Sequence, residues 1–86
     1  MHNIDLLKSQ PEPTFGTFGW ALWKVAQGHR ATRQGWNANG QWIALQVPDE
    51  NSKMRKPYMY MSPVDGELVP WLASQTDMLA SDWVCG

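Results

Sequence analysis

The sequence predicts a small α+β domain, on the strength of three local patterns. Apolar side chains from Phe18 to Val25 recur at the spacing of one helical face. Residues 41–47 and 57–61 have the composition and the bounding residues of strands. Ser74 and Asp77 stand at the spacing of a helix-capping box. With 86 residues the chain has room for one domain, so we expect an N-terminal helix, a short antiparallel sheet and a short C-terminal helix.

The first 14 residues are expected to form an arm appended to a domain of residues 15–86. Pro11 and Pro13 stop any helix that begins within residues 4–8. We therefore expect the arm to be ordered only where it docks.

The first helix of the domain is predicted to follow Thr17 as its N-cap and to close at Gly28 in the left-handed conformation. Its apolar face consists of Phe18, Ala21, Leu22 and Val25. Trp20 and Trp23 lie off the centre of that face. At least one of them is expected to contact a neighbouring subunit or to line a ligand site.

The strands are predicted in the second half of the chain. Residues 29–33 indicate a short strand that is broken at Gly35, and residues 41–47 indicate a stronger one. Residues 49–55 are polar and predict a loop before the strand of residues 57–61, which is rich in aromatic and flexible side chains.

The C-terminal third is predicted to add a hairpin, a helix and an edge strand. Asp65-Gly66 is a tight-turn signal that leads into residues 67–69. The capping-box spacing predicts a short helix from Ser74 to about Ala80. Residues 82–84 would then close the domain as an edge strand.

Charge and composition exclude several functions. Seven Lys and Arg against eight Asp and Glu leave a formal net charge of −1, so the chain has no general field for a DNA or RNA polymer. Cys85 and the two histidines have no metal-ligand spacing, and we expect no metal and no cofactor. No apolar run approaches the roughly 20 residues that span a bilayer, so we expect no membrane contact and a cytosolic location.

Six tryptophans are more bulky apolar surface than so small a core hides completely. Trp23, Trp42 and Trp83 suit the core or an interface best, because each lies in or beside a periodic element. The excess indicates a homo-oligomer, with some tryptophans at subunit interfaces and some lining a cavity.

Trp36 and Asn37 lie in the turn of residues 35–40, where an indole and an amide stand side by side. A nucleotide base stacks on an indole while its edge bonds to polar groups. Thr76 and Asp77 begin the last helix, where free N–H groups favour an anion and a carboxylate accepts ribose hydroxyls. The alternative for these residues is ordinary helix capping.

Two basic side chains near the turn, Arg30 and Arg33, offer charges to phosphates, although on an alternating strand such residues are more often simply solvated. We find no phosphate loop, nucleophile elbow or zinc spacing in the sequence. A module that binds its ligand without altering it is the simpler account.

Several segments taken together resemble the Thoeris anti-defence 2 family, formerly a domain of unknown function. The resemblance spans about residues 15–84, and it is carried by Phe18-Gly19-Trp20-Ala21-Leu22, Gly35-Trp36-Asn37-Ala38-Asn39-Gly40, Val69-Pro70-Trp71-Leu72-Ala73-Ser74-Gln75-Thr76-Asp77 and Asp82-Trp83.

The resemblance implies a phage protein that acts in the cytoplasm of the infected bacterial host. Family members bind the cyclic ADP-ribose isomer made by an infection sensor, without cleaving it, and form homotetramers with pockets at subunit interfaces. Some also capture cyclic oligonucleotides. On the matching positions, Trp36 and Asn37 would contact base or ribose, Thr76 and Asp77 would contact ribose or phosphate, and Phe18 would be a further contact.

The chain departs from the family pattern in its longer N-terminal arm and in the loop of residues 49–56, which leaves the choice of cyclic nucleotide open. Two other classes of function are also consistent with the residues. One is a tryptophan-rich accessory factor that binds a host or virion protein through exposed hot spots. The other is a nucleotide hydrolase, for which no general base or nucleophile is identifiable.

Overall fold

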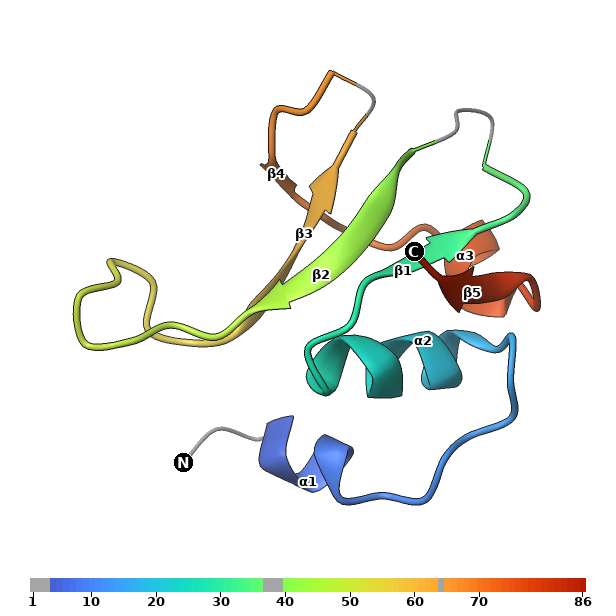
Figure 1. Cartoon of the computed structure of the whole chain (residues 1–86), viewed down its shortest axis with the longest axis horizontal. Coiled ribbons are helices and arrows are strands. Elements are labelled where there is room, and N and C mark those ends of the chain that lie inside the picture. Colours follow the sequence, from blue (N-terminus) through green and yellow to red (C-terminus); the bar gives the residue numbers. More distant parts are fainter. Residues whose placement is uncertain (1–3, 37–39, 64) are drawn as a thin grey trace.

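The computed structural model describes residues 4–36, 40–63 and 65–86, and Asn37, one of the predicted ligand contacts, lies outside them. Figure 1 shows an antiparallel sheet with α2 lying along it and α1 beyond α2. In the described ranges the elements are α1 (Ile4–Lys8), α2 (Phe18–Ala26), β1 (Ala31–Arg33), β2 (Trp42–Gln46), β3 (Tyr58–Ser62), β4 (Val69–Pro70), α3 (Gln75–Leu79) and β5 (Trp83–Cys85). The predicted α+β class is confirmed.

The five strands form one sheet in the order β4-β3-β2-β1-β5, with every neighbouring pair antiparallel. Ala31 in β1 pairs with Ile43 in β2 on one side and with Cys85 in β5 on the other. The C-terminal strand β5 thus lies beside the first strand, β1, at one edge of the sheet (Figure 1). The predicted edge position of the last strand is confirmed.

Both edges of the sheet have features that limit further pairing. At one edge, β4 is two residues long and ends in Pro70, which has no backbone N–H. At the other edge, the backbone N–H of Trp83 donates to Gly16 O at 3.0 Å. The loop before α2 therefore occupies part of the outer side of β5.

The local signals at both ends of α2 are confirmed. Thr17 Oγ1 accepts a hydrogen bond from the Trp20 backbone N–H at 3.2 Å, which satisfies one of the free donors of the first turn. Gly28 has a φ of 93°, as expected for a glycine that closes a helix.

The hairpin and the last helix also follow the predicted chemistry. Gly66 has a φ of 80° in the turn between β3 and β4. At α3, Ser74 Oγ accepts from the Asp77 N–H and Asp77 Oδ2 accepts from the Ser74 N–H, which completes the capping box.

The core lies between α2 and the sheet, and Trp83 at its centre has no exposed surface. At least one of Trp20 and Trp23 was expected to contact a subunit or to line a ligand site; Trp20 is only 2% exposed, so that expectation now rests on Trp23. The N-terminal arm covers Trp20, because Glu12 accepts from its Nε1 and the Phe15 ring packs against it. Trp42, expected in the core or at an interface, is half-buried on β2 with the Arg30 guanidinium 4.0 Å above its ring.

Two glycines with positive φ provide a matched test of the Gly16 contact. A Cβ at Gly16, whose φ is 92°, would lie 2.6 Å from Ser81 O, whereas a Cβ at Gly28 would meet nothing within 4 Å. We expect Gly28→Ala to cost about 1 kcal/mol of unfolding free energy through backbone strain alone. Gly16→Ala should cost about 3 kcal/mol, because overpacking adds to the same strain. Urea denaturation followed by tryptophan fluorescence measures both, and equal costs would contradict this account.

Candidate functional site

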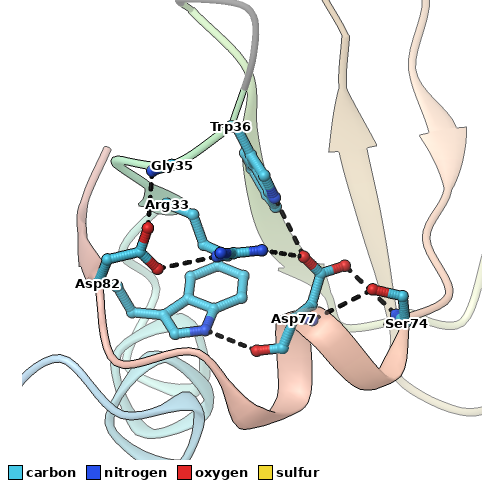
Figure 2. Close-up of polar contacts among 7 residues, drawn as sticks. Arg33, Gly35, Trp36, Ser74, Asp77 and Asp82 are labelled. Carbon is cyan, nitrogen blue, oxygen red and sulfur yellow. Dashed lines mark hydrogen bonds and ion pairs between the residues drawn. The ribbon is translucent and has the colours of Figure 1, made fainter.

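The candidate site is built around the guanidinium of Arg33, which extends from β1 to two carboxylates (Figure 2). Arg33 Nε donates to Asp82 Oδ1 at 2.8 Å, and Arg33 Nη1 donates to Asp77 Oδ1 at 2.8 Å. Asp82 Oδ2 also accepts from the Gly35 backbone N–H. One cation therefore joins β1, the turn after it, α3 and the residue that precedes β5.

Asp77 is the most heavily bonded residue of this network and is 9% exposed. Its Oδ1 accepts from Trp36 Nε1 at 3.1 Å as well as from Arg33. Its Oδ2 accepts from the Ser74 N–H at 3.3 Å, and its backbone carbonyl accepts from Trp83 Nε1 at 3.0 Å. The side chain thus caps α3 and at the same time fixes the orientation of the Trp36 ring (Figure 2).

The network shifts the pKa of all three charged groups toward the ionised form. Hydrogen bonds to Asp82 and Asp77 raise the pKa of Arg33 above its ordinary value. Burial raises the pKa of Asp77, but the hydrogen bonds from Arg33, Trp36 and Ser74 outweigh it and leave that pKa below its usual value. The Arg33 hydrogen bond, opposed by burial and helped by the Gly35 N–H, lowers the pKa of Asp82.

Four aromatic rings pack beside this network, and we call Phe18, Trp36, Trp71 and Trp83 the aromatic cluster. The Trp83 ring is its centre, with centroid distances of 5.6 Å to Phe18, 5.4 Å to Trp36 and 6.1 Å to Trp71. Trp36 and Trp71 meet edge to face at 6.4 Å. Trp36 is therefore held by packing on its ring and by a hydrogen bond on its nitrogen.

A pocket of about 360 Å³ adjoins Trp36 at the ends of β1 and β2. Its lining combines the indoles of Trp36 and Trp42 with the polar residues Gln34 and Gln41. Thr32, which also lines it, donates from its hydroxyl to Gln41 O at 2.7 Å. Aromatic walls with a few polar groups suit a planar ligand with a hydrogen-bonding edge.

The structure brings together Phe18, Trp36 and Asp77 of the five predicted ligand residues. Thr76 is exposed on α3, one position before Asp77. The four hydrogen bonds to Asp77 show that its capping and anchoring roles are already realised in the single chain. Its contact with a ligand stays a prediction.

Asp82 was not among the predicted site residues, and Arg33 was expected either to offer a charge to phosphates or to be simply solvated. In the structure the Arg33 side chain is largely buried and its charge is matched by two carboxylates, so it is neither a free phosphate-binding charge nor a solvated side chain. The partners are 44 and 49 positions away in the chain, and no local pattern joins them.

Two further findings concern the described residues. The described residues include no group of three or more His, Cys, Asp or Glu side chains arranged to hold a metal ion. None of the helices found in them has the length and hydropathy needed to cross a membrane.

Comparison with known proteins gives two similarities. A family model described as a Thoeris anti-defense 2-like domain matches residues 16–85. The curated protein "Thoeris anti-defense 2" of Bacillus phage SP01 is 29% identical over 80 residues, and the match covers 78% of this chain and 90% of the phage protein. The arm before residue 16 lies outside the family model.

The lowered pKa values of Asp77 and Asp82 predict how stability depends on pH. A carboxyl group with a depressed pKa in the folded state stabilises the fold above its unfolded pKa, and this stabilisation is lost as pH falls through the folded value. We expect the Tm to change little from pH 7 to 5 and to fall steeply below about pH 4. Asp77→Asn should lower the Tm at pH 7 and make the fall of Tm at acid pH, which we call the acid limb, less steep. Circular dichroism melts across this range test it, and an unchanged acid limb in Asp77→Asn would contradict it.

Proposed function

Because this chain belongs to the Thoeris anti-defense 2-like family, we propose that it is a phage anti-defence protein that sequesters a cyclic ADP-ribose-type signalling nucleotide in the host cytoplasm without cleaving it. The observation that carries the proposal is the position of Trp36, whose ring packs against Trp71 and Trp83 and also lines the pocket. Base stacking on an aromatic side chain contributes roughly 1–3 kcal/mol per base, and the fixed ring of Trp36 reduces the entropy lost on binding.

The charged network supports binding rather than hydrolysis. Asp77 and Asp82 have lowered pKa values, so at neutral pH they hold no proton for a general acid to give. Their oxygens already accept hydrogen bonds from Arg33, Trp36 and backbone N–H groups, which makes them weak general bases. The carboxylates nearest Trp36 are thus arranged for positioning.

We further propose that the active form is a homo-oligomer, a tetramer in keeping with the family resemblance. Leu72 is 92% exposed and Leu79 is 84% exposed, and Met78 between them is also exposed. Large apolar side chains left open around one short helix are typical of a subunit interface. Thr76 is exposed on the same helix, so a second copy on this side would cover this predicted ligand contact.

Sequestration acts through mass action alone. The protein must outnumber the messenger or bind it with a very low Kd, because each site removes one molecule and returns it when it dissociates. The second candidate, a protein-interaction accessory factor, would use the exposed Leu72 and Leu79 for a different partner and would bind no nucleotide.

Trp36 provides the direct test of the proposed site. We expect Trp36→Ala to raise the Kd for a cyclic ADP-ribose isomer by about 10- to 100-fold, because the stacking surface is lost. Trp36→Phe keeps a ring and should have a smaller effect. Isothermal titration measures both variants, and heat denaturation of the wild-type complex should release intact nucleotide. An unaltered Kd in Trp36→Ala would reject the site, and recovery of a cleaved product would reject sequestration.

Leu72 tests the proposed assembly. We expect Leu72→Asp to lower the mass of the particle in solution, because a charge would be buried at the subunit contact. Leu68→Asp is the matched control, since Leu68 is also exposed but lies in the β3–β4 hairpin. Size-exclusion chromatography with light scattering measures the mass. The interface is misassigned if Leu68→Asp dissociates the particle and Leu72→Asp does not.

A further inference from the structure

The outer flank of α2 is covered by the N-terminal arm of the same chain. Helix α1 packs against α2, and the chain then runs back beside α2 to its N-terminus (Figure 1). The covered flank carries Trp20, Trp23 and Lys24, with the Lys24 ammonium 5.7 Å and 5.3 Å from the two indole rings. Without the arm, this flank would present an aromatic and cationic patch to solvent.

Specific hydrogen bonds hold the arm in place. Trp23 Nε1 donates to Gln10 O at 2.9 Å, and Trp20 Nε1 donates to Glu12 Oε2 at 3.3 Å. Beyond them the ring of Phe15 meets Trp20 edge to face at 4.7 Å. Each indole nitrogen on this flank thus bonds to the arm, so the contact has a defined register.

The arm lies outside the domain that the family shares, because the matched region begins at residue 16. It contributes no residue to the Arg33 network or to the pocket beside Trp36. The arm therefore affects the domain by covering this flank of α2, which controls whether the flank is accessible to a binding partner.

We propose that residues 4–13 form an intramolecular cover that closes the tryptophan flank of α2 to a second copy of this chain. The proposal rests on the proposed self-assembly through the α3 side, which the cover leaves open. Tryptophan is among the side chains that dominate the energetics of protein interfaces, and an uncovered tryptophan patch on identical chains is available to pair with itself. A tethered arm has a high effective concentration and outcompetes a second copy while its bonds are intact.

The test uses the full-length protein and a variant that loosens the arm. Trp23→Phe removes the donor to Gln10 and keeps a ring, and Glu12→Ala removes the acceptor for Trp20. The matched control, Trp42→Phe with Glu67→Ala, makes the same two changes on β2 and in the β3–β4 hairpin. We expect trypsin to cut after Lys8 about tenfold faster in the arm variant than in the control, because cleavage follows the population of the opened state. Light scattering should then show a particle of higher mass than wild type.

Two results would overturn the proposal. One is equal cleavage after Lys8 in the wild type and the arm variant. The other is faster cleavage with no gain in mass, since the released flank would then bind no second copy. Trp23→Phe alone, with circular dichroism to verify the fold, gives the same readouts should the double variant not fold.

The Leu72→Asp background separates this proposal from the assembly on which it rests. A wild-type mass in Leu72→Asp would reject assembly through α3. In that background, loosening the arm should still raise the mass, because the α2 flank is a different surface. If the mass does not rise in that background, the proposed cover is overturned, whereas the proposed assembly through α3 is unaffected.

Discussion

The pairing of one guanidinium with two carboxylates is the interaction on which the rest of the structure depends. Helix α3 has five residues, far fewer than an isolated helix needs to be stable in water. Arg33 holds it against β1 through Asp77 and holds the start of β5 through Asp82. Asp77 Oδ1 also accepts from Trp36, so the same oxygen links Arg33 on the sheet to the aromatic cluster and fixes their relative positions. Loss of Arg33 would leave two partly buried carboxylates without a counter-charge.

The elements that the sequence predicted well are those specified by neighbouring residues. Thr17 caps α2 through a donor three positions away, Gly28 closes it, and Ser74 and Asp77 bond to each other across one turn. The network around Arg33 joins residues far apart in the chain, and a single sequence contains no signal for such pairs. The burial of Trp20 was missed for a similar reason, because the arm that covers it depends on a tertiary contact.

At the candidate site, too, the sequence indicated which residue types matter, but the surroundings of each residue depend on tertiary contacts. Aromatic and polar residue types pointed to Trp36 and Asp77, and the family resemblance added Phe18; the fold brings the three together. The capping role of Asp77 was predicted from its spacing to Ser74, but composition does not reveal how many hydrogen bonds a carboxylate accepts. The bonds from Arg33 and Trp36 to Asp77 therefore became visible only in the structure. The pocket between Trp36 and Trp42 likewise depends on how β1 and β2 end, which no local pattern specifies.

The protected edges of the sheet affect the concentration that this protein reaches in a cell before it aggregates. An open strand edge is a template for pairing with other chains, and at high concentration it leads to fibrils or amorphous aggregates. Pro70 interrupts one edge, and the Gly16 carbonyl occupies a donor on the other. Growth by strand addition is thereby discouraged, which favours a discrete soluble particle even when expression is heavy. The proposed stoichiometric capture of a nucleotide would require that kind of expression.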